Sequence, residues 1–155
     1  MTPAHPRPSE PYGLAEPPSS IRVLVVDDYP AVRNVTATLL TEARYIVQCA
    51  SSGGDALSII TARPEAFDLL VTDLDMSPGM WGDELIVRAR EHAPLLRVLV
   101  MTGEPDRLVE RARLDERNVI ILKKPFQAEN LCRAVRQALT LPPVTNTSLH
   151  PSTTP

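Results

Sequence analysis

Acidic, hydroxyl and ammonium side chains follow directly after apolar runs at four places in the sequence. One run ends in Asp27 and Asp28, another in Asp73, a third in Thr102 and the last in Lys123-Lys124. Carboxylates that are crowded together raise one another's pKa values unless a cation neutralises them. Mg²⁺ does this well, because it prefers a few carboxylates together with water and phosphate oxygens. These residue types therefore predict a magnesium site that handles phosphoryl groups, provided that the fold brings them together.

The chemistry of phosphoryl transfer matches this set of side chains. One carboxylate can act as the nucleophile and form an aspartyl phosphate. Lys124 can neutralise the charge of the incoming phosphoryl group, and Thr102 can donate a hydrogen bond to one of its oxygens. Little else is required, because catalysis of this reaction rests on positioning and charge stabilisation.

The apolar runs have the composition of buried strands. They are Ile21–Val26, Phe67–Val71, Arg97–Met101 and Val119–Leu122. Each is rich in Val, Ile or Leu without alternating polar residues, which is typical of strands buried on both faces. A fifth run, Tyr45–Ala50, alternates more and is predicted at a sheet edge.

Between these runs the apolar residues recur with the period of a helix. The clearest stripes are Val32, Val35, Leu39 and Leu40, and then Leu131, Ala134, Val135, Ala138 and Leu139. Shorter patterns predict three further helices around Leu57 and Ile60, Leu85 and Ala89, and Leu108 and Ala112. Ser52 and Asp55 resemble a capping box, and Pro30 and Pro105 suit a first helical turn.

The order is thus strand–helix, repeated five times. This alternation predicts an α/β fold with a five-stranded parallel sheet, doubly wound, with helices on both faces. Ligand sites of such sheets lie beyond the carboxyl ends of the strands. The acidic, hydroxyl and lysine residues are therefore expected along one edge of the sheet.

Composition bounds the rest of the chain. Ten of the 16 prolines lie in residues 1–20 and 140–155, which have no sustained apolar period, so we expect two disordered tails around one domain at residues 21–139. The net charge of −3 predicts binding neither to nucleic acid nor to an anionic membrane. The N-terminus lacks the pattern of a secretory signal, and Cys49 and Cys132 suit a reducing cytoplasm.

The residues at the strand ends resemble those of the response regulator receiver domains of two-component signalling. The resemblance covers residues 21–139 and rests on four motifs. These are Asp27-Asp28 after Val-Leu-Val-Val, Asp73 after Leu-Leu-Val-Thr, Met-Thr-Gly at 101–103 and Lys-Pro-Phe at 124–126. It implies a flavodoxin-like (βα)5 fold and a stand-alone phosphoacceptor rather than a turnover enzyme. It also implies Mg²⁺, a partner histidine kinase or histidine phosphotransfer protein as donor, and a downstream protein target.

The resemblance assigns roles by position. Asp73 is the expected phosphoacceptor, and Asp28 is expected to bind the metal directly, with Asp27 acting through water. The backbone carbonyl of Asp75 resembles the third protein ligand. Thr102 and Lys124 match the switch hydroxyl and the phosphate-binding lysine, and the Lys124–Pro125 peptide bond is expected to be cis. Lys123 should point away, because neighbouring residues in a strand face opposite sides.

The sequence departs from the family pattern at several positions. Ser77 is interpreted as an insertion in the loop after the acceptor. Trp81 replaces a small or polar residue, either as a half-exposed loop aromatic or as a contact for a partner or a cover over the site. Ile121 stands where an aromatic switch residue is usual. Asp75 and Glu104 border the site and are expected to affect the lifetime of the phosphoryl group. A charged face on the fourth helix is either solvated or a docking surface; its residues are Arg107, Glu110, Arg111 and Arg113.

Two rival functions remain open. Asp73-Leu-Asp75 also resembles the Asp-x-Asp box of haloacid-dehalogenase-type phosphatases, in which the first Asp is the nucleophile and the second the general acid. There, however, the acidic pair comes after the nucleophile strand, whereas here it comes before. The other rival is a receiver-like module that binds partners without phosphorylation. A transcription factor is not expected, because too few residues follow Leu139 for a helix-turn-helix domain.

Overall fold

The computed structural model describes residues 20–76, 79–106 and 118–143. These residues form five strands and four helices in strict alternation up to the fourth strand. The strands are β1 (Arg22–Val26), β2 (Ile46–Ala50), β3 (Leu69–Asp73), β4 (Arg97–Thr102) and β5 (Ile120–Lys123). The helices are α1 (Pro30–Glu42), α2 (Gly53–Ala62), α3 (Gly82–His92) and α5 (Ala128–Thr140).

The strands form one parallel sheet in the order β2-β1-β3-β4-β5. This confirms the predicted fold class and places β2 at an edge, as its alternating composition indicates. The fifth strand differs from the prediction, since it was expected to be buried on both faces. It forms the opposite edge, where Leu122 is buried and Ile121 is 37% exposed. An edge strand has a neighbour on one side alone, so apolar composition does not guarantee burial there.

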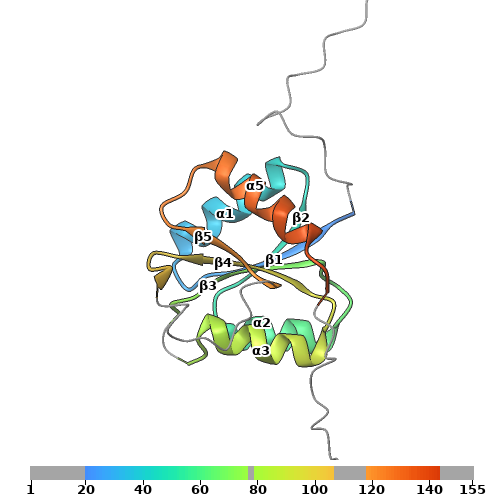
Figure 1. The fold of residues 1–155 in the computed structure, drawn as a ribbon. Coiled ribbons are helices and arrows are strands. Elements are labelled where there is room, and N and C mark those ends of the chain that lie inside the picture. Colours follow the sequence, from blue (N-terminus) through green and yellow to red (C-terminus); the bar gives the residue numbers. More distant parts are fainter. Residues whose placement is uncertain (1–19, 77–78, 107–117, 144–155) are drawn as a thin grey trace, which may run out of the picture.

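Helices cover both faces of the sheet (Figure 1). Helices α1 and α5 lie together on one face, and α2 and α3 lie on the other. Successive strand residues point to opposite faces. Thus Val23 and Val25 pack in the core with α1 and α5, whereas Leu24 and Val26 pack in the core with α2 and α3. The two cores fix the central strands, and with them the residues that follow those strands.

Local signals in the sequence explain where the helices begin. Pro30 occupies the first turn of α1, where its missing N–H leaves no helical hydrogen bond unmade. The Ser52 side chain accepts a hydrogen bond from the Asp55 backbone N–H at 3.1 Å, which caps α2 as predicted.

The predicted apolar stripe of α1 is only partly buried. The buried residues of the helix are Thr36 and Leu40, whereas Val35 of the stripe is 57% exposed. The side of the helix that faces the sheet therefore includes Leu39 and Leu40 of the apolar stripe but not Val35. Val35 instead lines a hollow beside the β5–α5 turn.

Several predicted features lie outside the described residues. They are Ser77, the predicted helix around Leu108 and Ala112, its charged face at Arg107, Glu110, Arg111 and Arg113, and most of the two predicted tails. Within the part of the chain that the structure describes, no helix is long and apolar enough to span a bilayer.

Candidate functional site

Three carboxylates meet at the carboxyl edge of the sheet. Strands β1 and β3 are neighbours, with Val26 opposite Thr72, so the residues that follow these two positions lie side by side. Carboxylate oxygens of Asp27, Asp28 and Asp73 all lie within 4.8 Å of one another. Asp27 and Asp73 are buried and Asp28 is exposed. The predicted convergence of the three acids is thus present, with one of them open to solvent.

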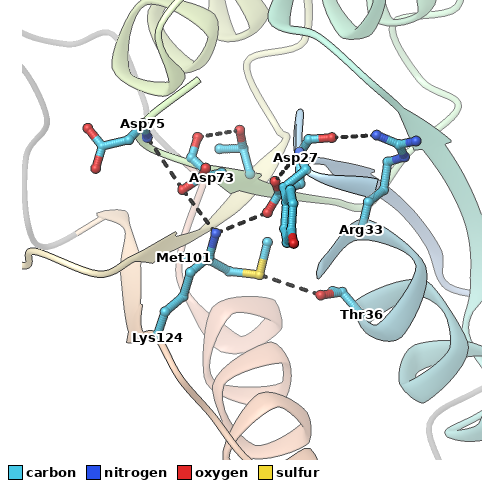
Figure 2. A network of polar contacts seen from close by, with 9 residues as sticks. Asp27, Arg33, Thr36, Asp73, Asp75, Met101 and Lys124 are labelled. Carbon is cyan, nitrogen blue, oxygen red and sulfur yellow. Dashed lines mark hydrogen bonds and ion pairs between the residues drawn. The ribbon is translucent and has the colours of Figure 1, made fainter. Parts of the chain in front are cut away.

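A single ammonium group joins two of these acids (Figure 2). The Nζ atom of Lys124 lies 3.0 Å from Oδ2 of Asp27 and 3.3 Å from Oδ1 of Asp73. The other oxygen of Asp27 accepts a hydrogen bond from the Tyr29 backbone N–H at 2.9 Å. A buried carboxylate needs such partners, because burial of an unpaired charge is very costly. The Lys124–Pro125 peptide bond is cis, as expected.

The acceptor candidate has a perturbed acidity. Burial raises the pKa of Asp73 above its ordinary value; Lys124 lowers that pKa, and the neighbouring Asp27 raises it again. The Asp75 backbone N–H also donates a hydrogen bond to Oδ1 of Asp73, at 3.4 Å. Because its pKa is raised overall, ionised Asp73 lowers the stability of the folded chain. A cation bound at this site would offset that free-energy cost.

The hydroxyl candidate lies on the next strand. Thr102 is fully buried at the end of β4, and its Oγ1 accepts a hydrogen bond from the Glu104 backbone N–H at 3.0 Å. The Lys124 backbone N–H donates to the Thr102 carbonyl at 2.8 Å, so β4 and the lysine are tied together. Lys123 is exposed and Lys124 half-buried, consistent with the choice of Lys124 for the site.

The remaining predicted site residues surround this centre at different depths. Asp75 is half-buried, and its carboxylate points away from Lys124 in Figure 2, while its backbone stays beside Asp73. Glu104 is exposed just beyond Thr102. Trp81, the N-cap residue of α3, is 42% exposed, and Ile121 lies on the edge strand β5.

Two residues with close contacts to the site were missed by sequence reasoning. The Arg33 guanidinium donates from Nη1 to the Asp27 carbonyl at 2.8 Å and so holds the β1–α1 turn. Gly82 packs against the acceptor backbone: a Cβ atom built there would lie 2.2 Å from the Asp73 carbonyl oxygen. Its N–H donates to the Leu74 carbonyl at 3.0 Å. The only signal in the sequence is a glycine shortly before the helix predicted around Leu85 and Ala89, and this signal does not indicate which atoms the glycine contacts.

An apolar hollow of about 410 Å³ lies beside Lys124. Residues Ala31, Val32 and Val35 of α1 form one wall, and Pro125 and Phe126 of the β5–α5 turn form the other. The lysine thus borders two different environments: the acidic cluster and an open apolar surface.

Comparison with known proteins agrees with this geometry. The family model described as "Response regulator receiver domain" matches residues 23–136. The chain is 34% identical over 117 residues to the chemotaxis protein CheY-3 of Vibrio cholerae, covering 72% of this chain and 86% of that protein. It is 34% identical over 125 residues to the sensor histidine kinase TmoS of Ectopseudomonas mendocina, covering 77% of this chain but 12% of the kinase.

A solved structure supports the same relationship. The response regulator receiver protein of Sinorhizobium medicae WSM419 superposes with a TM-score of 0.69 at 28% identity, covering 77% of this chain and 94% of that one. Sequence and fold therefore agree: the chain belongs to the response regulator receiver domain family of two-component systems.

Proposed function

We propose that residues 21–139 form a receiver that accepts a phosphoryl group on Asp73 from a histidine kinase or a histidine phosphotransfer protein. The observation that carries this proposal is the position of the Lys124 ammonium between Asp27 and Asp73, inside a cluster of three carboxylates. A buried nucleophile next to a fixed cation is what transfer of a highly charged group requires.

The transfer step exchanges one bond for another. A carboxylate oxygen of Asp73 attacks the phosphorus atom of a phosphohistidine, the phosphorus–nitrogen bond breaks, and its electron pair stays on the histidine ring. Lys124 neutralises charge on the transferred group from within the site. The hydroxyl group of Thr102, at the end of β4, then donates a hydrogen bond to a phosphoryl oxygen.

The charge balance of the cluster fits a divalent cation. Three carboxylates and one ammonium leave a net charge of −2 in a partly buried site. We assign Mg²⁺ to this cluster: Asp28, Asp73 and the backbone carbonyl of Asp75 would hold the ion directly, and Asp27 would hold it through water. When bound, the ion neutralises charge on the phosphoryl oxygens.

The apolar hollow offers a docking surface to the phosphodonor. A histidine donor must bring its ring to Asp73, so part of the donor must rest on the protein surface next to the site. The hollow borders Lys124, and its exposed Val35 suits an apolar helix face. We therefore place the donor between α1 and the β5–α5 turn.

Phosphorylation then changes which protein partner is bound. The added charge draws Thr102 and the loop after β4 inward, and this shifts the surface formed by β5, α5 and the fourth helix that the sequence predicts, whose residues lie outside the described part of the chain. Such a shift requires interactions that are stronger in one state than in the other. Ile121 on β5 stands where an aromatic switch residue is usual, so the conformational change depends on the movement of Thr102. A downstream protein binds the changed surface.

The proposal is tested by phosphorylation with a small-molecule donor and Mg²⁺, with the native chain beside Asp73→Asn. We expect one phosphoryl group on the native chain and none on the variant, measured by intact mass. Labelling of both proteins would refute the acceptor assignment. Labelling of neither would favour a phosphorylation-independent module, and steady hydrolysis of an aryl phosphate would favour the phosphatase.

A further inference from the structure

The outer face of α3 exposes two large apolar side chains. Trp81, just before the helix, is 42% exposed, and Val87, near its middle, is 40% exposed. Single exposed apolar residues are common and need no explanation. These two, however, line the same hollow of about 370 Å³, together with Asp83, Glu84, Arg88 and Glu91. The apolar groups thus lie within one concave surface, which we call the α3 hollow.

The α3 hollow carries an excess of negative charge. Its lining has three carboxylates and one guanidinium, a balance of −2. Arg88 is already paired, because its Nη2 lies 2.7 Å from Oε1 of Glu84. Within the described part of the chain, Asp83 and Glu91 therefore have no cation of their own in this hollow. A ligand with positive charge would supply what the lining lacks.

The spacing of these two acids determines what kind of cation fits. Asp83 and Glu91 are eight positions apart on the helix, which is about 12 Å along its axis. One metal ion cannot bind both carboxylates across that length. Two cationic side chains about four residues apart on an extended segment would match it. An aliphatic side chain between the two cations would meet the exposed apolar surface of Trp81 and Val87.

The α3 hollow is distinct from the phosphoryl site but fixed relative to it. Figure 1 shows α3 in the layer opposite α1 and α5, so the hollow lies on the other side of the sheet from the apolar hollow at Val35. The start of α3 is held against the acceptor strand by the hydrogen bond from Gly82 to Leu74. A partner on α3 would therefore leave the α1 surface open to the phosphodonor.

From these observations we propose that the α3 hollow binds a basic, extended segment of a partner protein. The segment carries two arginine or lysine side chains, which pair with Asp83 and Glu91, and an apolar residue between them, which packs on Trp81 and Val87. This binding does not depend on phosphorylation of Asp73.

The sequence itself provides the probe for a test, because Trp81 is the only tryptophan. A short synthetic peptide with two arginines about four positions apart and a leucine between them is titrated into the full chain while tryptophan emission is followed. We expect a saturable change in emission that weakens with added salt. Replacing both arginines of the peptide by glutamate should abolish it.

A matched pair of variants separates this surface from general negative charge. The double change Asp83→Asn with Glu91→Gln should weaken peptide binding roughly three- to ten-fold, as expected for two surface ion pairs. Glu65→Gln neutralises an exposed acid elsewhere and should leave the affinity unchanged. An emission that does not respond to the arginine peptide, or an equal affinity in the double variant, would overturn the proposal. So would dimerisation in sedimentation that Trp81→Ser abolishes, because the occupant would then be a second copy.

Discussion

The Nζ atom of Lys124 lies 3.0 Å from Oδ2 of Asp27, although 97 positions separate the two residues in the sequence. Asp27 is fully buried, so this contact compensates a charge that would otherwise stand alone inside the protein. The same ammonium group lies 3.3 Å from Oδ1 of Asp73. Lys124 therefore contributes both to the stability of the fold and to the proposed phosphoryl transfer.

Removal of this ammonium should affect both properties. We expect Lys124→Met to slow phosphorylation by a small-molecule donor roughly 100-fold, because a fixed group that stabilises charge is lost. Unfolding in urea should show a loss of about 3 kcal/mol, because Asp27 stays buried without its cation. Lys123→Met is the matched control, since Lys123 is the exposed last residue of β5 and directly precedes Lys124. Equal labelling rates in the two variants would contradict the assignment of Lys124.

A methyl group at Gly82 should disturb the acceptor. In Gly82→Ala the new Cβ would overlap the Asp73 carbonyl oxygen, so the α3 start must move away from β3. We expect a destabilisation of about 1–3 kcal/mol from overpacking, together with slower phosphorylation. Chemical denaturation and timed labelling measure the two effects.

Gly54→Ala provides the comparison for Gly82. Its Cβ would have nothing closer than the Ser52 hydroxyl at 3.9 Å, so it should leave labelling unchanged and stabilise α2 by about 0.5–1 kcal/mol. If Gly82→Ala had the same labelling rate and stability as Gly54→Ala, the close packing of α3 on the acceptor strand would not matter for phosphorylation.

The raised pKa of Asp73 predicts a pH-dependent gain of stability in Asp73→Asn. Burial raises the pKa of Asp73 in the folded chain, with Lys124 opposing this and Asp27 adding to it, so the ionised form is the costly one. Below the pKa of Asp73 in the unfolded chain, about 3.9, the native chain therefore keeps its full stability relative to Asp73→Asn. This relative stability falls as the pH rises through the higher pKa of Asp73 in the folded chain.

Urea midpoints across this pH range, in the presence of a metal chelator, measure the effect. We expect Asp73→Asn to be more stable than the native chain at pH 7, and the difference to shrink towards pH 4. Mg²⁺ should stabilise the native chain and leave the variant nearly unchanged, because ligands that bind the folded state raise its stability. A less stable variant at pH 7 would show that Asp73 contributes favourable contacts instead.

A charge in the apolar hollow should block the protein donor but not the chemistry. Val35→Glu places a carboxylate where the donor helix is proposed to pack, so transfer from a phosphorylated histidine phosphotransfer domain should fall at least roughly ten-fold, the effect of about 1.4 kcal/mol. Labelling by a small-molecule donor should be unchanged. Thr38→Glu adds the same charge at an exposed position of α1 outside the hollow. Equal transfer to both variants would move the docking surface elsewhere.

The two acids that border the site should set the lifetime of the phosphoryl group. Asp75 and Glu104 each follow a site residue by two positions, and Glu104 is tied to Thr102 by its backbone N–H. We expect Asp75→Asn and Glu104→Gln each to change the rate of dephosphorylation several-fold, as for a change of about 1 kcal/mol. Timed loss of the phosphoryl group measures this, and unchanged decay in both variants would end the idea.

The sequence by itself determined the five strands, the four helices that the structure describes, and the acids that follow the strands. Buried parallel strands read as unbroken apolar runs, and each such run stops where the chain leaves the sheet. The sequence alone therefore places Asp27, Asp28 and Asp73 at one edge of the sheet. The family resemblance added the choice of Asp73 as the acceptor and of Lys124 over Lys123, which strand ends alone do not decide.

Only the tertiary structure decided what those elements touch. Val35 and Ile121 belong to apolar patterns, yet both are exposed, because burial depends on which neighbour covers a face. The contact of Gly82 with Asp73 and that of Arg33 with Asp27 arise from the packing of a helix start and a turn onto the sheet edge. Periodicity reports which way a side chain points within its own element; distances between elements follow from the packing of the whole chain.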